Sequence, residues 1–268
     1  MVRRYISAFT MVSVLHRSLA ELLALIVPPA CAVCREPLSH SRDVVCLSCR
    51  VGLPWLHGPR CRRCGLPAPC RPCPAASASF EQAWAPVAYG ASARSIVMAF
   101  KFGGGVALAG FMAAQIAAGM EPQMSSGATL VAVPLHPKRR RQRGFDQAQR
   151  LTEALGVLTG MPVSRCLRRS GVASRQLGAG RSERTTAGRI LLKTVGRVPE
   201  VVVLVDDVHT TGATFEACAQ TLRAAGAQRV VCLAYARTLS GGGVTEPTPW
   251  LVRHRDGETT ADKRLTSA

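Results

Sequence analysis

Residues 201–214, VVVLVDDVHTTGAT, combine the residue types that a sugar-phosphate site needs. Five consecutive apolar residues, Val201 to Val205, predict a strand buried on both faces. Asp206 and Asp207 follow at its carboxyl end, and the turn 209–214 leads into a helix predicted from about Phe215 to Ala225. Because ligands of open α/β sheets bind outside the carboxyl ends of the strands, this stretch predicts a binding site.

The turn itself has the chemistry of an anion site. Gly212 lets the backbone approach a ligand closely, and the free N–H groups of a helix N-terminus bind phosphate. Two carboxylates would repel that phosphate, so Asp206 and Asp207 are expected to face ribose hydroxyls or a metal-bound pyrophosphate. The plainer alternative is a buried strand followed by a polar helix cap. A Walker B aspartate is disfavoured, because the chain contains no G-x-x-x-x-G-K-[ST].

A second strand, predicted over Thr129 to Val133, ends in a Pro-rich turn and a basic cluster, PLHPKRRRQRGFD. Cations after a strand end suit a pyrophosphate, and Lys138 and Arg139 are the nearest ones. His136 is a candidate general acid, although a lone histidine is more often a turn residue. The alternative is the solvated start of a basic helix.

Eight of the eleven cysteines form four C-x-x-C pairs within residues 31–73. They are Cys31, Cys34, Cys46, Cys49, Cys61, Cys64, Cys70 and Cys73. Two such pairs bind one tetrahedral Zn²⁺, and an all-cysteine shell leaves no position for a catalytic water, so the zinc is expected to be structural. Pairing in sequence order and cross-brace pairing both remain open. A disulfide framework is the alternative, and it would suit a secreted chain.

The 268 residues carry a net charge of +18, concentrated in two regions. Residues 138–197 hold 15 Lys/Arg against three acidic residues, and residues 1–75 hold ten Arg against three. Such regions favour a polyanion as partner, and single-stranded DNA is the first candidate. The alternative is that these charges, including the arginines around the cysteines, are only solvated. Arg168 to Arg189 is interpreted as either a lid over the pocket, with Gln176 and Arg181 to be tested first, or a solvated loop.

The remaining pattern predicts one α/β domain with attached segments. Residues 1–30 are expected to hold a docking helix over Val14–Val27, with a signal peptide as the alternative. No apolar run is long enough to span a membrane, and a cytoplasmic location is expected. We expect a double zinc ribbon at 31–74, a linker at 74–79, the α/β domain at 80–239 and a disordered tail at 240–268. The other expected elements are strands at 84–89, 162–167 and 230–235, helices at 92–102, 106–120 and 146–158, and a loop at 121–127.

VVVLVDDVHTTGAT resembles the 5-phosphoribosyl 1-pyrophosphate (PRPP) signature of the type I phosphoribosyltransferases. The chain also resembles the ComF family from about Leu19 to Arg237. The resemblance lies in the order of its parts: a helix, the CxxC pairs, VPLHPKRRRQRGFDQAQ and LVDDVHTTGAT. That resemblance implies a zinc ribbon fused to a type I phosphoribosyltransferase fold, with a central, mostly parallel sheet and flanking helices. It implies PRPP with Mg²⁺, a role in DNA uptake and transformation, and a DNA-translocating ATPase of the competence machinery as partner.

The resemblance also assigns residues to parts of the site. It implies that Asp206 and Asp207 bind the ribose and are catalytic. It implies that the 5′-phosphate is bound by Thr210, Thr211, Gly212, Ala213 and Thr214. It implies that the pyrophosphate is bound by Leu135, His136, Lys138 and Arg139. The expected activity is transfer of phosphoribose to an acceptor that the sequence does not name. Two rivals remain: a nucleic-acid-binding accessory protein of a DNA translocase that keeps the fold without catalysis, and a pure interaction module that docks through its zinc ribbon.

Overall fold

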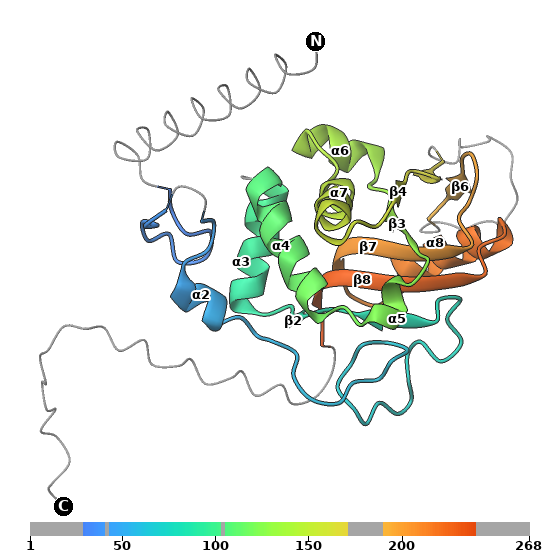
Figure 1. Ribbon diagram of the computed structural model, residues 1–268, viewed down its shortest axis with the longest axis horizontal. Helices are drawn as coiled ribbons and strands as arrows, with labels where there is room; N and C mark the ends of the chain where they lie inside the picture. The colour runs from blue at the N-terminus through green and yellow to red at the C-terminus, as the bar shows by residue number, and fades with distance from the viewer. Residues whose placement is uncertain (1–28, 41–42, 103–104, 171–189, 240–268) are drawn as a thin grey trace, which may run out of the picture.

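The computed structural model describes residues 29–40, 43–102, 105–170 and 190–239 (Figure 1). The helix expected over Val14–Val27, the tail from residue 240, and Gln176 and Arg181 lie outside the described residues. Within the described part of the chain, no helix is both long and apolar enough to cross a membrane.

A six-stranded parallel sheet forms the centre of the molecule, in the order β1-β8-β7-β3-β4, with β2 also paired to β8. Its strands are β1 Gln82–Trp84, β2 Val87–Ala88, β3 Thr129–Ala132, β4 Val163–Ser164, β7 Val201–His209 and β8 Arg229–Arg237. The expected strand at 84–89 is thus two short strands, interrupted at Ala85–Pro86, because proline cannot donate to a ladder.

Helices cover both faces of the sheet (Figure 1). They are α2 Leu47–Val51, α3 Ala91–Phe102, α4 Gly105–Gly119, α5 Pro122–Ser125, α6 Pro137–Arg143, α7 Gln147–Thr159 and α8 Ala213–Ala224. The alternation of β7 sorts its side chains between two cores: Val203 and Val205 pack with α3, α4 and α7, whereas Val202 and Leu204 pack with α8. The predicted fold, a central parallel sheet with flanking helices behind a Cys-rich region, is confirmed.

The sequence predicts the α7 helix well because both of its ends carry clear signals. Asp146 is the N-cap and accepts a hydrogen bond from the Gln149 N–H at 3.2 Å, and Gly160 ends the helix with a positive φ of 71°. Between them Ala148, Leu151 and Leu155 repeat at helical spacing and are buried. This helix packs on β3 and β7 and thereby fixes the strand ends that border the site.

Three other expectations need correction. The expected loop 121–127 contains the short helix α5, which starts at a proline. The expected strand 162–167 divides into β4 and β5, Leu167–Arg169, and β5 pairs antiparallel with β6, Leu192–Thr194, in a separate two-stranded sheet. The expected linker 74–79 is packed: Arg63 donates to the carbonyls of Ala75, Ala76 and Ala78, and the Ser79 N–H and hydroxyl both donate to the Glu216 carboxylate at 2.8 Å.

The two halves of the Cys-rich region dock at different places (Figure 1). Cys31, Leu38 and Leu53 of the first half join the core that includes α3 and α4. Cys64 of the second half joins the core that includes α8. Each half therefore stabilises a different face of the sheet.

Candidate functional site

The acidic pair lies inside β7, which runs on to His209 and does not stop at Val205 as expected. The strand is longer because β8 pairs with it as far as His209↔Arg237. Asp207 is buried, and its Oδ2 lies 3.0 Å from Nζ of Lys101 at the end of α3. Asp206 Oδ1 accepts a hydrogen bond from the Asp207 N–H at 2.8 Å.

Two adjacent carboxyl groups with one close cation leave uncompensated negative charge. Burial, followed by the neighbouring Asp207 carboxylate, raises the pKa of Asp206 well above its ordinary range. Ribose hydroxyls that donate to the carboxylates, or a divalent cation, would relieve this repulsion. Groups of either kind are the chemical partners that this pair of carboxyl groups could accept.

The turn after β7 leaves backbone N–H groups without capping side chains at the start of α8. Gly212 is the N-cap of α8 with φ of 87°, and no side chain caps the helix there. The first N–H groups of the helix therefore lack an intrahelical acceptor. The Thr211 hydroxyl accepts only a long hydrogen bond, 3.4 Å, from the Ala213 N–H. These are the properties of an anion site at a helix N-terminus.

Beneath the turn lies His209, which is 3% exposed. Its ring makes edge contacts with Phe215, centroids 5.1 Å apart, and with Phe80, 6.5 Å apart. A Cβ on Gly212 would lie 3.0 Å from His209 Nε2, and His209 Nδ1 has no hydrogen-bond partner. Burial, followed by the charge of Arg237, lowers the pKa of His209 to about 3.

The buried histidine predicts a loss of stability in acid. A depressed pKa means that the unfolded chain binds the proton more readily, so stability present above about pH 6.5 is lost as pH falls toward 3, by up to about 1.4 kcal/mol per pH unit. We expect His209→Leu to gain about 1 kcal/mol relative to the wild type between pH 7.5 and 5.5, measured by urea unfolding at both pH values. A pH-independent difference would contradict this assignment.

The basic segment after β3 is a helix, α6, which is the alternative that the sequence left open. His136 is its N-cap, and His136 Nδ1 accepts from the Lys138 N–H at 3.1 Å. The neutral ring consequently carries its proton on Nε2, where it is a donor. Lys138 itself is exposed.

A pocket of about 220 Å³ joins these parts at the carboxyl ends of β3 and β7. Seven of the expected site residues line it: Leu135, His136, Arg139, Asp206, Asp207, Thr210 and Thr214. Four others border the turn or α6 without lining the pocket: Lys138, Thr211, Gly212 and Ala213. The pocket is thus a small polar space lined by two acids and several cations, one of which, Lys101, pairs with Asp207.

Sequence reasoning missed four polar residues of the lining, namely Lys101, Arg143, Gln147 and Arg169. Arg169 Nε donates to the Pro134 carbonyl at 3.0 Å, and Arg143 donates to Gln147 Oε1 at 2.9 Å. Each lies at the end of an element that only folding brings to the pocket. Arg143 and Gln147 belong to the stretch VPLHPKRRRQRGFDQAQ that the sequence singled out, and Arg169 lies in the segment interpreted as a lid or a solvated loop. Lys101 carried no local signal.

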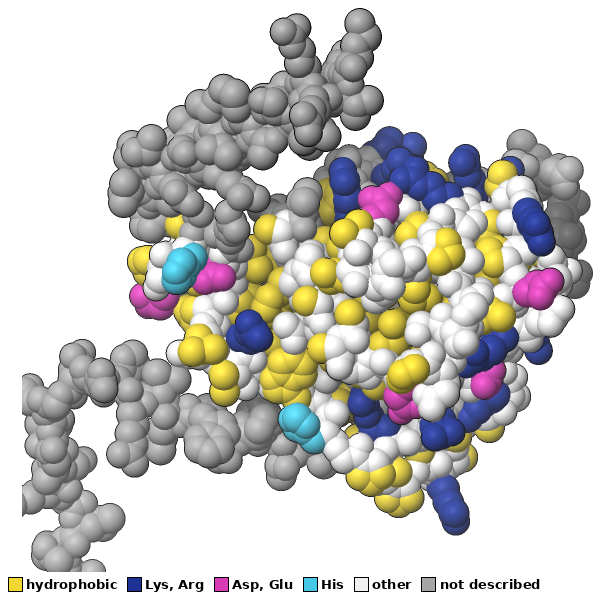
Figure 2. Space-filling view, in the orientation of Figure 1, with side chains coloured by type: hydrophobic (Ala, Val, Ile, Leu, Met, Phe, Trp, Pro, Cys, Tyr) yellow, Lys and Arg dark blue, Asp and Glu magenta, His cyan; other side chains and the backbone are white. Residues whose placement is uncertain are grey.

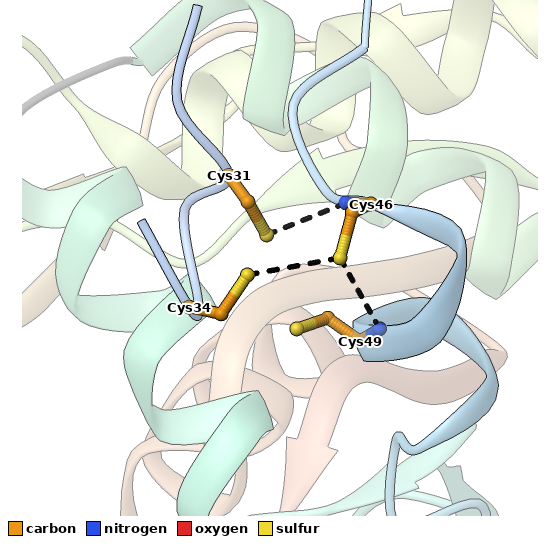
Figure 3. Close-up of side chains that lie close together, drawn as sticks. All are labelled: Cys31, Cys34, Cys46 and Cys49. Atoms are coloured by element: carbon orange, nitrogen blue, oxygen red, sulfur yellow. Dashed lines mark hydrogen bonds between the residues drawn. The ribbon is translucent and has the colours of Figure 1, made fainter. Parts of the chain in front are cut away.

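The eight cysteines form two groups of four in sequence order, which settles the pairing left open above (Figure 3). The first four-cysteine group is Cys31, Cys34, Cys46 and Cys49, and the second is Cys61, Cys64, Cys70 and Cys73, with all ligand atoms of a group within 4.8 Å. The Sγ–Sγ distance is 3.7 Å for Cys34–Cys46, 3.7 Å for Cys61–Cys73 and 3.4 Å for Cys64–Cys70. These values are near the ~3.8 Å edge of a tetrahedron with Zn–S bonds of about 2.3 Å. Both groups fit structural zinc ribbons.

The grouping predicts that each chain binds two zinc ions, and that removing a ligand of one ion leaves the other ion bound. Cys34→Ser is expected to leave one zinc, and Cys70→Ser is expected to leave the other, because three thiolates hold Zn²⁺ far less tightly than four. Native mass spectrometry of the purified variants counts the ions. Cys166→Ser, a buried cysteine outside both groups, serves as control and should retain two. Loss of both ions from either single variant would contradict independent sites.

These features define an α/β protein with a parallel sheet and two four-cysteine groups. Residues 22–79 match the double zinc ribbon domain family. The chain is 30% identical over 241 residues to the DNA utilization protein YhgH of Salmonella typhi, covering 80% of this chain and 100% of that protein. It is 36% identical over 101 residues to the competence protein ComFC of Streptococcus pneumoniae, covering 37% of this chain and 44% of that one. The chain belongs to the ComF family.

Solved structures also align with part of the chain. The phosphoribosylpyrophosphate synthetase of Mycobacterium smegmatis aligns with 50% of this chain and 34% of its own, at 19% identity and a TM-score of 0.30. The glutamine PRPP amidotransferase of B. subtilis aligns with 47% of this chain and 25% of its own, at 25% identity and a TM-score of 0.31.

Proposed function

We propose that the chain binds Mg-PRPP in the pocket at the ends of β3 and β7 and transfers phosphoribose to an acceptor in DNA uptake or utilization. One observation carries the proposal: an acidic pair and several cations line one pocket of about 220 Å³, and the uncapped Gly212 turn borders it through Thr210 and Thr214. The names of the relatives, competence protein and DNA utilization protein, support the cellular role.

In this proposal each wall of the pocket holds one part of PRPP. Asp206 and Asp207 accept hydrogen bonds from the ribose hydroxyls, and the amides of residues 211–214 with the Thr210 and Thr214 hydroxyls hold the 5′-phosphate. Arg139 and the His136 Nε2–H hold the pyrophosphate. Mg²⁺, carried with PRPP, supplies further neutralisation of the pyrophosphate charge.

Catalysis would follow from positioning and electrostatics. As pyrophosphate leaves C1, positive charge develops on the sugar and negative charge on the leaving oxygens. Arg139 and Arg169 line the pocket and would stabilise the charge on the leaving group, whereas Lys101 pairs with Asp207. A second cavity of about 430 Å³ shares Pro134, Leu135 and Arg169 with the first, and it is the space proposed for the acceptor. Its Arg140, Arg165 and Arg168 favour an anionic acceptor.

Calorimetry with Mg-PRPP tests the binding step. Wild type should bind, and Asp207→Ala should not, because the truncation removes a ribose acceptor and leaves Lys101 without its carboxylate. No heat from the wild type would end the proposal. A pyrophosphate-release screen over bases, nucleotides and DNA ends would then identify the acceptor.

A second candidate is a nucleic-acid-binding accessory protein of a DNA translocase, in which the pocket is not catalytic. It is favoured by the exposed Lys and Arg side chains gathered over α6 (Figure 2). It requires single-stranded DNA binding that weakens steeply with salt. Anisotropy titrations of a labelled oligonucleotide at several salt concentrations separate the two candidates, since salt-insensitive binding or none would count against this one.

A further inference from the structure

A single side chain connects the second four-cysteine group to the Gly212 turn. Arg237, the last residue of β8, is 3% exposed. Its Nε donates to the Cys64 carbonyl at 3.0 Å, and its Nη1 donates to the His209 carbonyl at 2.9 Å. The same Nη1 also contacts the Thr210 carbonyl. One guanidinium thus binds the backbone of a metal-ligand residue and the backbone where the turn begins.

The second four-cysteine group also lies beside the buried charge of Arg237. Within the described residues, no carboxylate lies within ion-pair distance of this guanidinium. A buried guanidinium without a counter-charge is strongly unfavourable. Four thiolates around Zn²⁺ would carry a net charge of −2, and the Cys64 backbone that Arg237 binds belongs to this group.

Packing places the second group and the turn in one unit. Cys64, Phe80 and Phe215 belong to the same core, and His209 lies between the two phenylalanines. The second ribbon docks closely on β1: the Ala83 N–H donates to the Arg62 carbonyl at 3.1 Å, and a Cβ on Gly65 would lie 3.0 Å from the Ala83 carbonyl oxygen. The first four-cysteine group packs in the other core and has no such connection among the described residues.

We propose that Arg237 is a positioning residue that couples zinc at Cys61, Cys64, Cys70 and Cys73 to the order of the turn 210–214. Loss of that zinc removes the counter-charge of the guanidinium and releases the Cys64 carbonyl, so the turn loosens. Loss of zinc from the first group leaves the turn as it was. The consequence for ligand affinity rests on the proposed function, whereas the order of the turn does not.

Hydrogen exchange tests the coupling without any ligand. The amides of Thr238 and Glu216 donate to the turn carbonyls of His209 and Gly212 and so report the order of the turn. In Cys70→Ser and in Arg237→Met they should exchange about ten-fold faster or more, the effect of losing one charge-assisted hydrogen bond. The matched control Cys34→Ser empties the first group and should leave this segment unchanged. Arg237→Lys keeps the positive charge but has a single nitrogen as donor group. It should therefore recover part of the protection that Arg237→Met loses.

The same samples show whether an effect is local. Amides of Val201–Val205 in β7 report global unfolding, and native mass spectrometry reports zinc content. Should Cys70→Ser fail to fold, stepwise removal of zinc from the wild type with a chelator replaces it, with exchange plotted against the zinc remaining. Acceleration that is confined to the turn and follows loss of the second zinc supports the proposal. An unchanged turn, equal acceleration in Cys34→Ser, or acceleration spread evenly over β7 overturns it.

Titration with Mg-PRPP completes the test. Arg237→Met and Cys70→Ser should each weaken binding about ten-fold, and the double variant should be little weaker than either single one, because both break the same connection. Additive losses would contradict the coupling. If the wild type itself does not bind Mg-PRPP, the proposed function fails, and the exchange result still decides whether zinc orders the turn.

Discussion

Replacing Asp206 with asparagine is expected to stabilise the free protein and to weaken Mg-PRPP binding. The raised pKa of Asp206 means that the folded protein holds a proton that the unfolded chain releases, so wild-type stability is lost as pH rises from about 4 through the raised value. Asparagine removes this charge and can still accept from the Asp207 N–H. At pH 8 a gain of at least about 1 kcal/mol, or about 2–4 °C in Tm, is expected.

The same change should reduce Mg-PRPP affinity about 10- to 100-fold, because a charged hydrogen-bond acceptor for the ligand is lost. Thermal unfolding at pH 5 and pH 8, with calorimetry at pH 8, measures both effects. Glu200→Gln, an exposed acid at the opposite end of β7, controls for the loss of one negative charge and should change neither quantity. A variant that is less stable than the wild type at pH 8 would contradict the predicted gain, and unchanged affinity would contradict a role for this carboxylate in binding.

Replacing Gly212 with alanine is expected to damage both the fold and the site. The residue has φ of 87°, which costs a non-glycine residue about 1–2 kcal/mol. A Cβ would also press on His209 Nε2 at 3.0 Å, so the buried ring or the turn must shift. We expect a loss of about 1–3 kcal/mol in unfolding free energy and at least about a ten-fold loss of Mg-PRPP affinity, from urea unfolding and calorimetry respectively.

Gly196 provides the matched control for this variant. It has φ of 71°, but a Cβ there would meet nothing within 4 Å, and it does not line the pocket. Gly196→Ala should therefore show the backbone cost alone and retain ligand affinity. If Gly196→Ala and Gly212→Ala bind Mg-PRPP equally well, the turn does not hold the phosphate.

The sequence predicts the acidic pair and the turn because their signals are local. A continuous apolar run, two acids and a glycine within fourteen residues are enough to specify a buried strand, a polar strand end and a turn with positive φ. The strand is nevertheless longer than expected, because its last residues are held by pairing with β8 and not by their own hydrophobicity. Asp206 and Asp207 therefore lie within a ladder and not in a loop.

The places of Lys101 and Arg169 in the pocket could not be predicted from local patterns. Lys101 is a single lysine at the end of an apolar helix, and Arg169 lies on a short strand of a separate sheet. Both reach the pocket only because α3 and β5 dock beside β7 and β3. The helical state of α6 is one of the two alternatives that the sequence leaves open, and the proline at its first position, with His136 as N-cap, is the signal that favours it.

Chemical-shift mapping with the two halves of PRPP tests the central claim most directly. Ribose 5-phosphate should shift the backbone amides of Thr211 to Thr214 in a ¹⁵N spectrum and leave those of Leu135 to Arg139 nearly unchanged. Magnesium pyrophosphate should do the reverse. Two separate sets of shifts at these two strand ends are the expected result, whereas shifts elsewhere, or none at millimolar ligand, would contradict a phosphoribosyl site in this pocket.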